Sequence, residues 1–218
     1  MPMVFTYVGY KGDNMINLDE INTVYFDVLK EIGNIGAGNA TTALAKMLDM
    51  KIDMKVPKVE LLEFAALAAV ISKEDEPVMG ILLEVQSDIA GSMMFFLELD
   101  SAHYLVNRLM GRDVDNRDEF TEMELSALKE IGNIISGSYL SALSSLTNMT
   151  ITSSIPYLCI DMAGAILSVP AIEFGKYGDK ALLIQTEFGD DVMINGYFIL
   201  LPELDSYEKI LSSLGIVV

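Results

Sequence analysis

The sequence predicts an α+β fold: an internally duplicated, pseudo-twofold domain in which two long surface helices and several shorter helices pack on a largely antiparallel sheet. The first observation is a repeat, because Lys30–Ile35 returns unchanged as Lys129–Ile134, 99 positions later. A repeat at a fixed offset indicates a duplicated structural unit. The second observation is that both halves read as long helix, strand, short helix, two strands and helix. Consecutive strands joined by short turns favour antiparallel pairing, and helices grouped apart from strands favour separate layers of helices and sheet.

The repeat extends well beyond these six residues. Further identical pairs at the offset of 99 are Gly38 and Gly137, Met50 and Met149, and Pro57 and Pro156. Near the ends of the halves, Gly91 matches Gly196 and residues 99–101 match 204–206, at an offset of 105. The two offsets differ by six, so the second half holds six additional residues, which we place within 163–178.

The chain divides accordingly into four parts. Residues 1–16 form an N-terminal extension without a counterpart in the second half, and 17–111 form the first repeat. Residues 112–119 are a charged linker without apolar periodicity, and 120–218 form the second repeat. We expect the repeats to make one pseudo-symmetric domain. A monomer is then sufficient, because the twofold axis is internal.

In the first half, a helix is expected from Asn17 or Asp19 to about Leu48. Its apolar residues recur at spacings of four and three, the pattern of an amphipathic helix. These residues are Ile21, Tyr25, Val28, Ile32 and Ile35. The remaining expected elements are strands at 51–56, continued by 59–64, a buried helical turn at 65–71, strands at 78–85 and 89–99, and a helix at 102–110 capped by Asp100.

The second half repeats this plan. A helix is expected from about Thr121 to Leu146, opened by a capping box between Thr121 and Glu124. In that motif each side chain bonds the backbone N–H of the other residue. The further expected elements are a strand at 150–154, an apolar segment at 159–169, strands at 181–187 and 192–201, and a closing helix at 203–214.

Composition excludes several classes of function. The net charge of −18 would repel nucleic acid and anionic membranes, and no apolar run reaches the ~20 residues of a membrane-spanning helix. With one cysteine, Cys159, and one histidine, His103, neither an intrachain disulfide nor a zinc site is expected. The lone cysteine favours a reducing, cytoplasmic location.

A glutamate and an asparagine three residues apart stand at the centre of each repeat: Glu31 and Asn34, then Glu130 and Asn133. At ~100° per residue they lie on the flank of the apolar stripe, so they are expected to face solvent. A glutamate and an asparagine on the flank of a helix commonly do no more than form part of its solvent-exposed face. Here two features favour a function: the recurrence, and a preceding glycine that costs ~1 kcal/mol relative to alanine in a helix.

The glycines near these pairs have two interpretations. Gly33 and Gly132 either allow close packing of the helix or give a partner clear access to the pair. For Gly36, Gly38 and Gly137, which alternate near the apolar side of the helix, close packing is the expected role.

Glutamate and asparagine without a nucleophilic His, Cys or Lys limit the chemistry. A carboxylate can act as a base or bind a partner's lysine. An amide can hold a water molecule, because it both donates and accepts hydrogen bonds. The combination suits hydrolysis that depends on positioning, with the metal supplied from elsewhere.

The long spacing around these pairs is more specific. Asp27, three residues, Glu31, two residues, Asn34, 22 residues and Pro57 form one pattern. The second copy runs from Ser126 to Pro156 with the same spacing. This duplicated pattern resembles the signature of the CheC/CheX/FliY family, which are phosphatases of the chemotaxis response regulator CheY.

The resemblance implies that Asn34 and Asn133 orient the water that attacks the aspartyl phosphate of CheY. It also implies that Glu31 and Glu130 contact the active-site lysine of the regulator. No cofactor or metal site is expected in this chain, because the regulator would supply Mg²⁺. The positions assigned to partner binding are Asp27, Gly33, Ser126, Gly132 and Asp161.

The resemblance further implies a second partner, the receptor deamidase CheD. Asp161, in the segment 159–166, is either part of an exposed binding edge for CheD or the cap of a buried helix. A non-catalytic adaptor that binds CheY or CheD is the alternative function. The intact Glu and Asn in both copies favour the enzyme. A structural subunit of the flagellar switch would be expected to carry a further domain.

Overall fold

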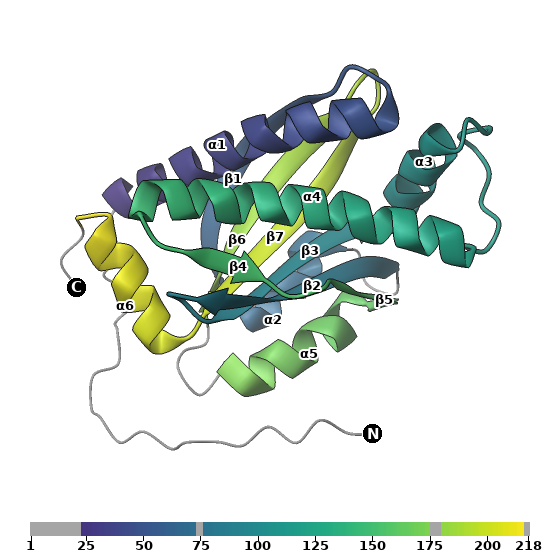
Figure 1. Ribbon diagram of the computed structural model, residues 1–218. Helices are drawn as coiled ribbons and strands as arrows, with labels where there is room; N and C mark the ends of the chain where they lie inside the picture. Colours follow the sequence, from purple (N-terminus) through teal and green to yellow (C-terminus); the bar gives the residue numbers. More distant parts are fainter. Residues whose placement is uncertain (1–22, 73–75, 175–179, 216–218) are drawn as a thin grey trace.

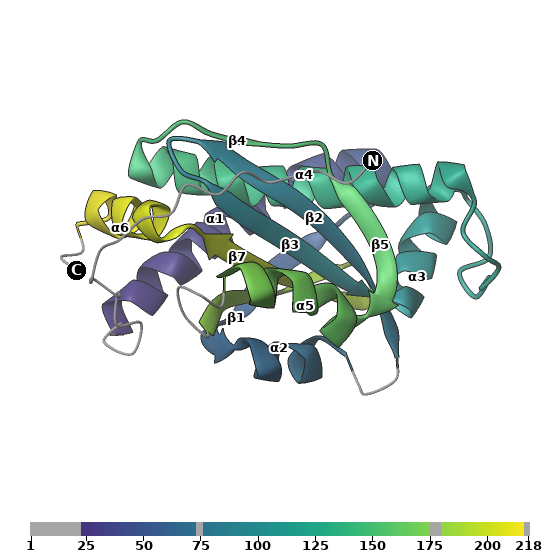
Figure 2. The same cartoon turned by 90° about the horizontal axis from the view of Figure 1, so that it is seen from below.

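The computed structural model describes residues 23–72, 76–174 and 180–215. In these residues seven strands form one sheet, and six helices pack around it so that both faces are covered (Figures 1 and 2). The elements are, in chain order, α1 (Thr23–Leu48), β1 (Asp53–Glu63), α2 (Phe64–Ile71), β2 (Pro77–Ser87), β3 (Gly91–Glu98), α3 (Leu99–Leu109), α4 (Glu122–Thr147), β4 (Ile151–Ser153), β5 (Tyr157–Met162), α5 (Ala163–Phe174), β6 (Lys180–Gly189), β7 (Met193–Pro202) and α6 (Leu204–Ser213).

The elements follow the predicted order in the first half. The second half has one strand more than predicted, because β5 occupies the start of the expected apolar segment 159–169. α1 ends where predicted, whereas its predicted start and the extension 1–16 lie outside the described residues. The predicted strands 51–56 and 59–64 form one strand, β1, whose register shifts around Pro57, a residue that cannot donate to the ladder. In the second half, the equivalent Pro156 lies between two separate strands, β4 and β5.

One local expectation is wrong, and one of the two alternatives for Asp161 is excluded. α3 begins at Leu99 with Glu98 as its N-cap residue, so Asp100 lies in the first turn and does not cap the helix. Asp161 lies on β5, before α5 begins, so it does not cap a buried helix either. α5 has 12 residues where α2 has 8, so part of the additional length of the second half lies in this helix.

The two halves exchange strands within the sheet. Its order is β1-β6-β7-β3-β2-β4, and β5 also pairs with β2. β1 of the first half thus pairs with β6 of the second, and β4 and β5 pair with β2, all antiparallel. At the centre Met94 pairs with Ile199, and these two residues are equivalent at the offset of 105. The pseudo-twofold axis therefore passes between β3 and β7.

The domain has three layers. α1 and α4 lie side by side in opposite directions across one face of the sheet, with α3 and α6 near their ends (Figure 1). α2 and α5 cover the opposite face (Figure 2). Because side chains alternate along a strand, Phe198 packs in the core under α1 and α4, whereas Ile199 packs in the core under α2 and α5.

α1 and α4 are in close contact at Gly36. A Cβ atom there would lie 2.9 Å from Cα of Tyr139, nearer than carbon atoms pack, so the predicted packing role of Gly36 is confirmed. The Tyr139 ring lies 4.4 Å from that of Phe198, which stacks at 4.5 Å on Phe95. Burial raises the pKa of Tyr139 to about 12, although the neighbouring Thr186 side chain lowers it in part. The phenol therefore stays neutral.

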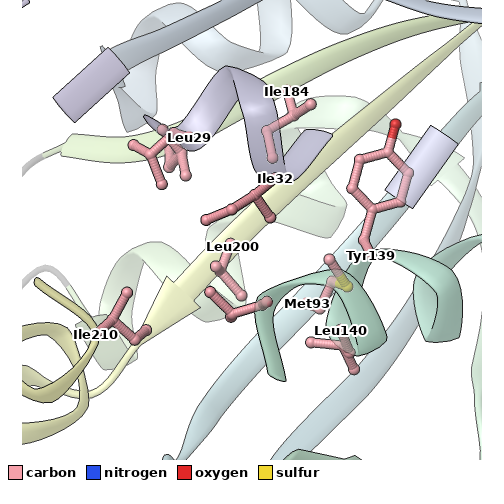
Figure 3. Close-up of a pocket in the computed structure, with 10 residues that line it drawn as sticks. Leu29, Ile32, Met93, Tyr139, Leu140, Ile184, Leu200 and Ile210 are labelled. Atoms are coloured by element: carbon pink, nitrogen blue, oxygen red, sulfur yellow. The ribbon is translucent and has the colours of Figure 1, made fainter. Parts of the chain in front are cut away.

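A small apolar cavity of about 30 Å³ lies between α1, α4, α6 and the sheet. Figure 3 shows Leu29 and Ile32 of α1 converging there with Leu200 of β7, and the Tyr139 hydroxyl directed away from it. A water molecule in this cavity would lack the polar partners that buried waters require. The cavity is therefore part of the core and not a ligand site.

The N-terminus of α4 carries the predicted capping box. The Thr121 hydroxyl accepts the backbone N–H of Glu124 at 3.4 Å, and the Glu124 carboxylate accepts the backbone N–H of Thr121 at 2.6 Å. Arg112, in the linker, also donates to this carboxylate. The hydrogen bond from the Thr121 backbone is the main cause of a lowered pKa for Glu124.

Replacing Glu124 with glutamine is expected to reduce the free energy of unfolding at pH 7 by about 1 kcal/mol, because the cap loses its charged acceptor. The pKa of Glu124 is lower in the folded chain than in the unfolded chain, where it is near 4.5. Ionised Glu124 therefore stabilises the fold at pH values above 4.5, and this stabilisation is lost as the pH falls through the folded-state pKa. Denaturant unfolding should therefore show a deficit at pH 7 that shrinks below pH 4.5. Glu122→Gln, in the same first turn but exposed, is the control. A pH-independent deficit would contradict this account.

Candidate functional site

Each long helix carries a strip of polar residues on its solvent-facing side. The strips consist of Asp27, Glu31 and Asn34 on α1 and of Ser126, Glu130 and Asn133 on α4. Spacings of four and three place each set on one helix face. All six residues are exposed except Asn133, which is half-buried. The predicted exposure is therefore confirmed for Glu31, Asn34 and Glu130, whereas Asn133 is only partly exposed.

The polar groups of both pairs have no partner within the described part of the chain. Among residues 23–72, 76–174 and 180–215, no side-chain hydrogen bond or ion pair involves Glu31, Asn34, Glu130 or Asn133. Polar side chains that hold a fold together are usually paired. These four are therefore available to a partner.

The two helices that carry the strips, α1 and α4, lie side by side on one face of the sheet (Figure 1). Gly36 lies opposite Tyr139. Asn34 precedes Gly36 by two residues, and Asn133 precedes Tyr139 by six. Because the helices are antiparallel and rise about 1.5 Å per residue, the two asparagines are about 12 Å apart along the helix axis.

Gly33 and Gly132 face the sheet and not a partner. Both are buried. A Cβ atom at Gly33 would lie 3.2 Å from Val56, and one at Gly132 would lie 2.4 Å from Ile81. Their role is close packing, so their assignment to partner binding is wrong.

Gly38 and Gly137 show the opposite behaviour. A Cβ atom at either position would meet no other group within 4 Å, so the packing role expected for them is wrong. Each lies four residues, about one helical turn, beyond the asparagine of its strip. The sequence contains a signal for a shared role, since Gly38 and Gly137 are counterparts of each other at the offset of 99.

Asp161 lies on β5, at an edge of the sheet where β5 pairs only with β2 among the described strands. Its carboxylate is exposed and accepts the backbone N–H of Met162 at 2.8 Å. Large exposed apolar side chains occur on or beside this edge and on α5: Ile155, Tyr157, Ile160, Val169 and Ile172. The structure thus places Asp161 on an exposed edge, one of the two arrangements that the sequence allowed.

Two further properties of the described residues bear on the chemistry. Within them, no group of three or more His, Cys, Asp and Glu side chains is arranged to hold a metal ion. None of their helices is both long enough and apolar enough to cross a membrane.

Known proteins share the sequence pattern. The sequence model of the CheC-like family matches residues 27–61 and 123–156, and these segments contain both strips. The CheY-P phosphatase CheC of Bacillus subtilis (strain 168) is 37% identical over 195 residues, which cover 87% of this chain and 93% of that protein.

Solved structures share the fold. Thermotoga maritima FliY has a TM-score of 0.73 at 22% identity, over 90% of this chain and 98% of that one. A chain in the FliG–FliM complex from H. pylori has a TM-score of 0.69 at 13% identity, over 88% of this chain and 100% of that one. At these identities the likeness shows the α+β architecture alone.

Proposed function

The chain belongs to the CheC-like family, and we propose that it is a protein phosphatase of chemotaxis that hydrolyses the aspartyl phosphate of the response regulator CheY. One observation carries this proposal. The equivalent helices of the two repeats each present a Glu–Asn pair at the surface, with no partner in the described part of the chain. The family relative that is named as a CheY-P phosphatase supports the same activity.

In the proposed reaction, the regulator docks on one strip with its aspartyl phosphate over the asparagine. The amide of Asn34 or Asn133 holds one water molecule in line with the bond between phosphorus and the aspartate oxygen. The water oxygen bonds to phosphorus as that bond breaks, and the products are the aspartate carboxylate, inorganic phosphate and a proton. Positioning is sufficient, because phosphoryl transfer needs little covalent assistance.

Glu31 and Glu130 would fix the orientation of the docked regulator. A carboxylate forms a strong charge-assisted hydrogen bond with a lysine ammonium group, and each glutamate lies one helical turn before its asparagine. Since the described residues offer no metal cluster, we propose that the regulator brings its own Mg²⁺. The site is then complete only in the docked complex.

Two measurements on CheY test the proposal against the adaptor alternative. One is the decay rate of phosphorylated CheY with and without the protein. The other is the affinity of the protein for CheY held in its activated state by beryllofluoride. A phosphatase binds activated CheY and accelerates the decay. If the protein binds activated CheY but leaves the decay rate of phosphorylated CheY unchanged, it is a non-catalytic adaptor and not a phosphatase.

We further propose that CheD modulates the activity by binding at the edge formed by β5. Asp161 supplies an exposed charge there, and Tyr157 and Ile160 on the same strand supply exposed apolar surface. An edge strand also offers unpaired backbone groups to a partner. This edge lies outside the two strips, so CheD and CheY would contact different residues.

Asp161→Lys is expected to weaken CheD binding by about tenfold or more, because reversing a charge at a contact opposes association. The decay of phosphorylated CheY without CheD should stay unchanged. Titration of CheD into the wild-type and variant proteins measures the effect. Asp205→Lys, at an exposed carboxylate on α6, is the matched control. Equal CheD affinity of the Asp161 variant and the control would contradict the assignment.

A further inference from the structure

We infer that Gly38 and Gly137 are docking positions for the regulator, at which bare helix backbone lets the partner surface come close enough for the adjacent asparagine to reach the phosphate. This inference rests on the proposed function, since it assigns two further residues to the same surface.

The placement of the two glycines is the first argument. Residues four apart lie on the same face of a helix, so Gly38 extends the strip of Asn34, and Gly137 extends that of Asn133. Gly38 is exposed and Gly137 half-buried. The space beside both is open, because an added Cβ atom would meet no other group within 4 Å.

The fold itself gives no reason for glycine at these positions. Neither residue has a positive φ, and both lie inside helices, far from a cap. Glycine in a helix interior is less favourable than alanine by roughly 0.5–1 kcal/mol. By contrast, Gly33, Gly36 and Gly132 each face a neighbouring side chain that a Cβ atom would crowd.

The repeat supplies an independent argument. Gly36 corresponds to Ile135 at the offset of 99, so the two helices differ where their packing differs. Gly38 and Gly137 are the same residue although neither is packed. The feature that these two environments share is the Glu–Asn pair, whose asparagine lies about one turn and whose glutamate about two turns before the glycine.

The reach of asparagine explains the requirement physically. Its side chain is short, so its amide can hold a water at the phosphorus only if the partner surface comes close to the helix backbone. A side chain one turn away on the same face would meet that surface first. The glycine clears this space, which suits a protein partner whose phosphate lies among surface loops.

Alanine and leucine substitutions at the two glycines separate docking from folding. Gly38→Ala and Gly137→Ala are each expected to raise Tm by about 2–4 °C, because helix propensity improves and no clash arises. The Gly38→Leu/Gly137→Leu double variant is expected to bind beryllofluoride-activated CheY about tenfold or more weaker than wild type, a change of about 1.4 kcal/mol, with the alanine pair in between.

Matched controls are Asn39→Ala and Ser145→Ala, at exposed positions on the same two helices, which should leave CheY affinity unchanged. Gly36→Ala should lower Tm, because its Cβ atom would lie 2.9 Å from Cα of Tyr139, a backbone atom that cannot move aside. Affinity is the chosen readout because it does not depend on hydrolysis. If wild type binds activated CheY without hydrolysing the phosphate, the proposed activity fails and the glycine test still decides. Wild-type affinity in the leucine double variant, or no binding of CheY to wild type, would overturn the inference.

Discussion

The variant that carries both Asn34→Ala and Asn133→Ala is expected to lose the acceleration of CheY dephosphorylation by on the order of 10²-fold or more, the usual effect of removing a group that acts on the reacting atoms. Both side chains lie on the solvent-facing strips and have no hydrogen-bond partner in the described part of the chain. Their loss should therefore spare the fold, and alanine is the better helix former. The expected signature is lost activity with equal or higher thermal stability.

The single variants report how the two sites divide the work. Each should retain the activity of the untouched strip, because the two asparagines belong to separate sites about 12 Å apart along the helices. The measurement is the decay of phosphorylated CheY with equal amounts of wild-type, single and double variants, alongside a thermal melt of each. A double variant with wild-type activity would refute the positioning of water by asparagine. A large drop in Tm would show that these residues have a structural role.

The largest expected loss of stability follows from Phe198→Ala, at about 3–5 kcal/mol. Phe198 is fully buried on β7, next to the pseudo-twofold axis. Its ring contacts Phe95 of the first half and Tyr139 of α4. Removing the ring opens a cavity at the point where both halves and a long helix meet.

Denaturant unfolding of the Phe198 variant measures this loss. Met123→Ala, at a position that is 72% exposed, is the control and should change the free energy of unfolding by less than about 0.5 kcal/mol. A loss below about 1 kcal/mol for Phe198→Ala would be typical of an ordinary mutation. It would contradict the view that the aromatic contacts at the axis hold the interlocked halves together.

The sequence predicts the elements other than β5, but it does not predict how the strands pair. Periodicity and turn residues predicted the long helices, the capping box at Thr121 and most strands. The exchange of β1 and β5 between the halves could not be predicted, because either repeat offers an equivalent antiparallel partner. A repeat alone does not distinguish pairing within a half from pairing across halves.

The errors at the glycines have a simple geometrical origin. Adjacency in sequence suggests that Gly33 shares the environment of Asn34, but neighbouring residues on a helix point about 100° apart. That rotation turns Gly33 and Gly132 toward the sheet. Gly38 and Gly137, four residues beyond the asparagines, share their face.

The sequence around Asp161 is ambiguous for a different reason. A short apolar run is compatible with a buried helix or a strand, since it lacks a distinguishing period. Here the strand ends at Met162 and the helix begins at the next residue. Only tertiary pairing with β2 determines that boundary.

In the proposed function, a Glu–Asn strip completes an active site when phosphorylated CheY docks on it. The most direct test is the decay of a large excess of phosphorylated CheY after addition of a trace amount of this protein. We expect the release of many equivalents of inorganic phosphate per molecule of protein, at a rate proportional to the protein concentration. A decay rate equal to that of CheY alone, from protein shown to bind activated CheY, would contradict it.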